Sequence, residues 1–181
     1  MKYLKKSGIM LAVLLASVPG LATAQVRIEV EADPIAYAVN GYSGHLAAFF
    51  TDRVRAQVGA FGADVPEWLH GNDGFDVRTR GVTVKVDRYL SDRGTGAFVG
   101  LDGDYSRVRY RHDESGDATS RNLYGLGPRI GYRFNLGDRF FAVPWVSVRY
   151  VFNTSDVTLG GELLEESEFA VFPTVHIGFR F

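Results

Sequence analysis

The sequence predicts an all-β fold, an eight-stranded antiparallel up-and-down β-barrel that spans a membrane. Three observations predict it. Apolar and polar residues alternate with a period of two along the chain after residue 24, and no stretch shows a sustained helical repeat. The alternating runs number eight, and short and long connections alternate between them. Every predicted strand therefore has one apolar face, which either a protein core or lipid must cover.

The first 24 residues predict an export signal that precedes the barrel. Lys2, Lys5 and Lys6 come before a short apolar run, and Ala22-Thr23-Ala24 has the small-residue pattern of a cleavage site. A retained membrane helix is the alternative, but the apolar run is shorter than the ~20 residues that a span needs. We therefore expect a cleaved signal peptide at 1–24 and one barrel domain at 25–181.

Composition excludes several classes of function. Removing the three signal lysines from the 20 basic residues leaves 17 against 21 acidic residues, a net charge of −4, which is too acidic for non-specific binding of nucleic acid. The chain has no cysteine, which excludes disulfides, thiolate metal sites and cysteine nucleophiles. No motif indicates a cofactor or a metal site, and we expect none.

The predicted strands follow one another as regular alternating runs. The first has apolar residues at even positions and charged residues at odd positions, and the sixth and seventh carry arginines opposite an aromatic and branched face. The last strand ends the chain on Phe181, with Phe179 and Ile177 on the same apolar face. The eight predicted strands are residues 26–33, 42–50, 54–60, 76–88, 96–110, 121–134, 140–152 and 169–181.

The connections predict which end of the barrel faces the periplasm. In bacterial outer-membrane barrels the periplasmic turns are short and the extracellular loops are long. With eight strands, both chain termini then lie at the short-turn end. The short connections are residues 51–53, 89–96 and 135–139, and the long ones are 34–41, 62–74, 112–120 and 153–168.

The polarity of the two faces predicts lipid on the outside. A soluble barrel is apolar inside and polar outside, whereas a membrane barrel reverses this. After residue 24 the chain has 16 arginines and one lysine, and arginine suits enclosed pairing with carboxylates. We expect a lumen filled by side chains, with a structural charge network, and a soluble barrel is the alternative fold. The network residues are Arg27, Arg55, Arg129, Arg133, Arg149 and Arg180 with Glu29, Glu31, Asp33, Asp102 and Asp104.

With these features, the chain after residue 24 resembles the small eight-stranded outer-membrane barrels of the OmpA and OmpX type. The resemblance implies a place in the bacterial outer membrane, contact with its lipid and lipopolysaccharide, and assembly by the barrel-assembly machinery. In that group an aromatic C-terminal strand resembles the assembly signal, which here consists of Phe181, Phe179 and Ile177. The match is partial, because His176 stands where many such signals have glycine and Gly178 is displaced. We expect a monomer.

Ser43 and His45 are the only catalytic pattern that the strands suggest. Both lie on the inward face, near Glu29 or Glu31 of the neighbouring strand, and resemble the Ser-His-acid set of a lipid A hydrolase. A lipase must present its triad to lipid, whereas these side chains face the lumen. We therefore favour a structural hydrogen-bonded cluster, and no enzymatic activity is expected.

The long loops carry the residues expected to meet the outside. They are acidic, and Trp68 and Leu69 are apolar residues in one of them, which predicts either contact anchors for an extracellular partner or side chains that fold back into the barrel mouth. We expect a non-enzymatic barrel that acts in envelope integrity or surface interaction. A small-solute channel and a lipid A-modifying enzyme are the alternatives.

The outer face changes character at four arginines. Apolar residues at 82–86 share their parity with Arg78 and Arg80, and the next strand continues its apolar face into Arg107 and Arg109. A hairpin register with residue 80 near 104 gathers the four at the extracellular end. Charge costs ~2–4 kcal/mol at mid-bilayer and ~0–1 kcal/mol near the interface, so we expect them at headgroup height, as contacts for lipopolysaccharide phosphates. Two alternatives are that the arginines pair with Asp76 and the acidic loops, or that the strands twist out of phase above the membrane.

Overall fold

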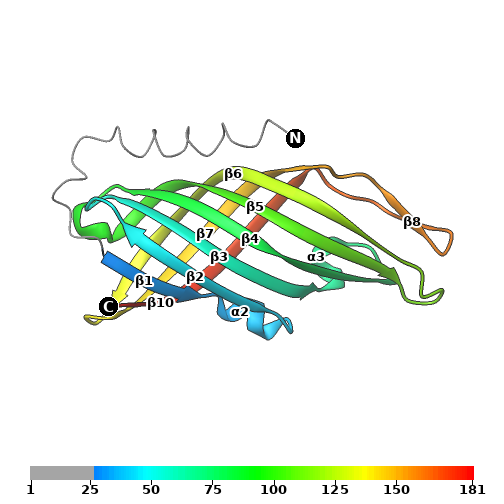
Figure 1. Ribbon diagram of the computed structural model, residues 1–181, viewed down its shortest axis with the longest axis horizontal. Helices are drawn as coiled ribbons and strands as arrows, with labels where there is room; N and C mark the ends of the chain where they lie inside the picture. Colours follow the sequence, from blue (N-terminus) through cyan, green and yellow to red (C-terminus); the bar gives the residue numbers. More distant parts are fainter. Residues whose placement is uncertain (1–26) are drawn as a thin grey trace, which may run out of the picture.

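The computed structural model describes residues 27–181, and the predicted signal peptide lies outside that range. Eight antiparallel strands form a closed barrel in the order β1-β10-β7-β6-β5-β4-β3-β2 (Figure 1). Consecutive barrel strands pair with each other, and β1 pairs with β10 to close the ring. The predicted all-β, eight-stranded up-and-down barrel is therefore confirmed.

The barrel strands differ greatly in length, and the ends of the longest extend well past the others (Figure 1). Two short helices and a small two-stranded sheet, β8-β9, lie in the connections. Within the described range, no helix is long and apolar enough to cross a membrane. The elements are β1 (Arg27–Ala32), α2 (Pro34–Ala38), β2 (Tyr42–Phe49), β3 (Val54–Val65), α3 (Glu67–His70), β4 (Phe75–Tyr89), η1 (Asp92–Gly94), β5 (Gly96–His112), β6 (Ala118–Leu136), β7 (Phe140–Phe152), β8 (Val157–Leu159), β9 (Glu162–Leu164) and β10 (Phe169–Arg180).

The expected strict alternation of short and long connections is wrong at one place. Strands β5 and β6 continue as a hairpin to residues 112 and 118, so their connection is only residues 113–117. Strand β3 likewise continues to Val65, five residues past its predicted end. Part of the chain predicted as long loops is therefore strand, because the ladders extend beyond the apolar part of the outer wall.

The inside and the outside of the barrel exchange polarity along its length. In the half near the short turns, the outer wall is apolar, and the inner wall carries buried ion pairs beside an aromatic cluster. In the half near the long loops, apolar side chains pack inside and arginines lie outside. The inner apolar cluster of that half consists of Phe75, Val77, Val108, Tyr110, Val157 and Leu164.

Strand β1 is the shortest of the barrel strands and leaves part of its neighbour uncovered. Its last residue, Ala32, pairs with Ile177, so the part of β10 before that residue has no partner in β1. Helix α2 follows at once and contacts β10, β2 and β3 (Figure 1). Asp33 caps this helix by accepting a hydrogen bond from the Ile35 amide at 2.8 Å, and it also accepts one from Thr174 Oγ1 at 2.6 Å. The helix therefore occupies the place where a longer β1 would have paired.

Candidate functional site

The lumen contains a network of buried ion pairs centred on two glutamates of β1. Glu29 accepts two hydrogen bonds from Arg133, with Nη1–Oε2 at 2.8 Å and Nη2–Oε1 at 2.7 Å. Arg55 and Arg180 also approach Glu29, each with its Nε 3.4 Å from a carboxylate oxygen. Arg55 is fully buried, so its charge is stabilised mainly by the carboxylates around it.

Glu31 also has partners on β3 and β10, and it shares Arg55 with Glu29. Its carboxylate accepts hydrogen bonds from Arg55, from Gln57 Nε2 at 2.5 Å and from His176 Nδ1 at 2.8 Å. Together the two glutamates join β1 to β3, β6 and β10. Such bidentate and shared contacts are what enclosed carboxylates require, because burial removes the water that would otherwise solvate their charge.

Asp87 and Lys85 extend the network beyond the residues that sequence reasoning selected. Asp87 lies 3.4 Å from both Arg55 Nη1 and Arg129 Nε, and it is completely buried. Lys85 is also buried, with its Nζ 5.2 Å from the ring centre of Trp145. Lys85 and Asp87 alternate with the outward valines at 82–86, so both side chains lie on the inward face of β4. This alternation is the sequence signal that identifies them as residues of the lumen.

The predicted network is otherwise largely present. Arg149 contacts Asp104 at 2.5 Å and approaches Asp102 at 3.9 Å. Two predicted members have other roles. Arg27 lies over the ring of Phe49 at 4.5 Å, and Asp33 caps α2. Arg27 and Asp33 differ from the other members because they lie at either end of β1, and only Glu29 and Glu31 of this strand lie within the charged network.

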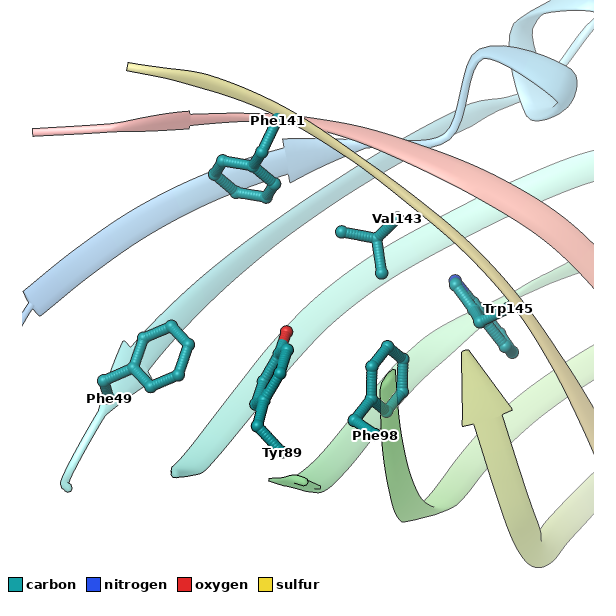
Figure 2. Packing of buried hydrophobic residues seen from close by; sticks show 6 residues of the cluster. All are labelled: Phe49, Tyr89, Phe98, Phe141, Val143 and Trp145. Atoms are coloured by element: carbon teal, nitrogen blue, oxygen red, sulfur yellow. The ribbon is translucent and has the colours of Figure 1, made fainter. Parts of the chain in front are cut away.

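An aromatic cluster fills the lumen near the short turns. Phe49, Tyr89, Phe98, Phe141, Val143 and Trp145 point inward from β2, β4, β5 and β7 (Figure 2). The guanidinium carbon of Arg133 lies 3.6 Å from the ring centre of Phe141, and that of Arg129 lies 4.1 Å from that of Trp145. The cluster therefore packs directly against the ion-pair network. With the apolar cluster at the opposite end, side chains occupy the lumen at both ends.

Ser43 and His45 form a hydrogen bond but not a catalytic triad. Ser43 Oγ lies 2.8 Å from His45 Nε2, and both residues are buried. His45 Nδ1, which would need the acid, has no partner among the described residues and faces Gly59, where a Cβ would fall 1.9 Å away. Glu31 instead contacts His176, whose ring stacks on that of His45 at 4.6 Å. The geometry favours the structural interpretation of this pair.

The outer wall has an apolar band with aromatic residues at both edges. Val82, Val84 and Val86 on β4 face outward and are about half exposed. Aromatic side chains cluster in pairs toward each edge, as in membrane barrels. The edge near the long loops has Tyr105, Tyr124, Tyr150, Phe152 and Phe169, and the edge near the short turns has Tyr132, Phe134, Phe140, Phe179 and Phe181.

The four outer arginines lie together on β4 and β5. Arg78 pairs with Arg109, and Arg80 pairs with Arg107, so the predicted proximity is present. The register suggested from sequence, with residue 80 near 104, is wrong by three positions. The 3₁₀ turn at Asp92–Gly94 shifts the centre of the hairpin toward β5, and Asp104 faces the lumen. Arg78 also forms ion pairs with Asp64 and Asp76, each at 3.3 Å. The alternative prediction, pairing with Asp76, is therefore confirmed for this one arginine.

The remaining candidates lie on exposed surfaces. Trp68 and Leu69 are on α3, and Trp68 is 81% exposed, so these side chains do not fold back into the barrel mouth. At the C terminus, Phe179 makes edge-on contacts with Phe140 and Phe181, with 5.3 Å between ring centres in each pair. Ile177 is outward and partly exposed, as its parity predicts. No group of side chains able to hold a metal ion occurs among residues 27–181.

Comparison with known proteins identifies the fold. Neither a protein-family model nor a curated protein sequence matches the chain. The N-terminal β-barrel domain of Pseudomonas aeruginosa OprF matches with a TM-score of 0.52 and 14% identity, covering 86% of this chain and 96% of that one. A major outer membrane protein from Thermus thermophilus matches with a TM-score of 0.50 and 15% identity, covering 87% and 100%. At such low identity, the likeness establishes the outer-membrane β-barrel fold and no particular function.

The ion-pair network predicts a large effect of removing its central cation. We expect Arg55→Met to lower the free energy of unfolding by about 3–5 kcal/mol, because Glu29, Glu31 and Asp87 would lose a shared buried partner. Urea unfolding of the barrel in detergent micelles measures this. The matched control is Arg53→Met, two residues away, where an exposed pair with Asp92 at 2.6 Å should leave stability unchanged. Equal effects of the two substitutions would contradict a stabilising role for the network.

Proposed function

We propose that this protein is a non-enzymatic, integral barrel of the bacterial outer membrane that acts through its extracellular end. The observation that carries the proposal is the exchange of polarity along the barrel. An apolar outer wall edged by aromatic residues suits lipid, whereas the far half has the apolar interior and charged exterior of a protein in water. The long loops, α3 and β8-β9 all belong to this second half.

The packed lumen supports a role other than transport. A strand number of eight leaves room for little more than side chains, and here the two apolar clusters and the ion pairs between them occupy that room. Glu31 lies opposite His45 but is hydrogen-bonded to His176, and His45 Nδ1 has no partner among the described residues, which supports a non-enzymatic role over hydrolysis of lipid A. Surface interaction or maintenance of the envelope is the function that these features fit best.

The exposed loop residues give that function a candidate contact surface. Trp68 and Leu69 present apolar side chains from α3, at the end of the barrel where β3 leaves the apolar band. Large exposed apolar residues at such a position are typical of contact anchors. We propose them as contacts for an extracellular partner, and the protein as a monomer within the membrane.

The proposed orientation is testable because the chain has no cysteine of its own. Glu114→Cys lies in the β5–β6 connection and Asp138→Cys lies in the β6–β7 turn, and both positions are exposed. On intact cells, a membrane-impermeant maleimide should label the first variant and not the second, with labelling of both after the outer membrane is permeabilised. The reverse pattern, or labelling of a soluble periplasmic species, would contradict the proposed placement.

The filled lumen predicts no conductance. Purified protein in planar bilayers should give a flat current trace at high salt, because the aromatic cluster and the ion pairs fill the path that water would take. A known porin in the same bilayer serves as the positive control. Discrete single-channel steps from the folded protein would favour the channel alternative.

The C-terminal aromatic residue is proposed to act in assembly by the barrel-assembly machinery. Deleting Phe181 removes an exposed side chain worth ~2 kcal/mol of apolar burial in lipid, together with the end of the proposed signal. We expect a lower yield of heat-modifiable barrel in the outer-membrane fraction. Phe169→Ala is the matched control, because it removes an outward aromatic residue from the other end of β10. Equal yields of the two variants would reject the assembly role.

A further inference from the structure

The outer wall of β4 and β5 changes from apolar to cationic over three successive pairs of outward residues. Val82, Tyr105 and Tyr124 lie side by side on adjacent strands. The next outward positions bring Arg80 beside Arg107, and the level after that brings Arg78 beside Arg109. Successive outward residues on a strand are about 7 Å apart, so the first pair of guanidinium groups begins directly above the apolar band. We call Arg80, Arg107, Arg109 and Arg111 the arginine patch.

The protein balances only part of the charge of the arginine patch. Asp76 lies opposite Arg111 in the β4–β5 ladder, but it and Asp64 form their ion pairs with Arg78, and among the described residues none of the four patch members makes an ion pair. Like charges that face each other across two strands repel and destabilise the pair of strands. An anion from outside the chain would therefore relieve the repulsion where Arg80 lies opposite Arg107 and Arg109 beside Arg78.

The neighbouring side chains suit a phosphate oxygen. On β6, Asn122 pairs with Arg107, and Ser120 pairs with Arg109, so neutral hydrogen-bonding groups flank the arginines at both levels. Asp76, Arg78, Arg109 and Arg111 line a shallow hollow in the same surface. Guanidinium groups bind phosphate through paired N–H donors, and hydroxyl and amide groups add further contacts to its oxygens.

The position of the arginine patch selects a lipid as the source of the phosphate. A free anion would need only the arginines, whereas the patch continues downward without a break into Val82, Val84 and Leu101, which are each about half exposed. An amphiphile with phosphate groups at the upper level and acyl chains along the valines satisfies both parts of this surface. Burying its chains on the apolar wall adds to the attraction between the charges.

We propose that the arginine patch binds the phosphate groups of a phosphorylated glycolipid in the outer leaflet, with its acyl chains along the outer face of β4 and β5. This inference rests on the proposed placement in the membrane, which the cysteine labelling above tests separately. It assigns to the lipid the anion that offsets the charge of the patch, and it makes Arg78 a structural residue held by its two aspartates.

The test measures binding of diphosphoryl lipid A to folded protein in detergent micelles, with bound lipid counted by native mass spectrometry. Arg80, Arg107 and Arg109 are replaced together by glutamine, which keeps side-chain length and hydrogen-bonding capacity. Each lost charge should weaken binding about fivefold, so the triple variant should bind on the order of 100-fold more weakly than the wild type. Monophosphoryl lipid A should bind wild type more weakly than the diphosphoryl form.

The matched control removes the same number of charges from the other edge of the band. Arg53, Arg88 and Arg139 are exposed, and their triple glutamine variant should bind diphosphoryl lipid A as the wild type does. Heat-modifiability confirms that both variants are folded. Equal affinities of the two triple variants for diphosphoryl lipid A would overturn the proposal. Complete displacement of the lipid by excess inorganic phosphate would also overturn it, because the patch would then bind a free anion. If the cysteine variants are labelled on cells as expected but the two triple variants bind lipid A equally, the proposal for the arginine patch fails and the proposed function stands.

Discussion

The structure depends on one constraint: charged faces that cannot meet lipid must be enclosed and neutralised. Glu29 and Glu31 lie on the first strand, whereas Arg133, which donates two hydrogen bonds to Glu29, lies 104 residues later. These partners meet only when β1 has joined the ring. Closing the barrel and neutralising its lumen are therefore one event, and an open sheet of the same strands would expose carboxylates and guanidinium groups together.

The seam between β1 and β10 is the shortest ladder of the barrel, with four paired positions. The Phe181 amide donates to Ile28 and the Arg180 amide to Arg139, so odd-numbered residues of β10 direct their N–H groups toward β1. Pro173 is odd-numbered and lies in the part of β10 that has no partner in β1. The backbone N–H that proline lacks would therefore have pointed to an edge where no strand pairs. Helix α2 covers this edge, tied to β10 through Asp33 and Thr174. The short strand β1 is therefore followed by α2, which contacts the part of β10 that β1 does not reach.

Sequence reasoning reached the fold but not all of the site, for identifiable physical reasons. The period-two pattern located all eight barrel strands, since a strand between lipid and a charged lumen must alternate strictly. It missed α2, which is too short for a helical period, although Asp33-Pro34 is a helix-start signal. It also misjudged the β4–β5 register, although parity alone excludes an inward Asp104 as the direct partner of an outward Arg80. The contacts of Glu31 with His176 and of His45 with Gly59 depend on side-chain packing across the lumen, which no strand pattern contains.

The chain uses arginine for opposite purposes on the two sides of its wall. Inside, Arg133 pairs with Glu29 while its guanidinium lies on the face of Phe141, so the aromatic cluster fixes the cation that neutralises the first strand. The lumen is then a packed core in which the ion pairs and the aromatic cluster contact each other. Outside, Arg80 and Arg107 have no such partners among the described residues and mark the level at which both walls exchange polarity. Because side chains occupy the lumen at both ends, the outer wall and the loops are the surfaces that the described residues leave exposed to other molecules.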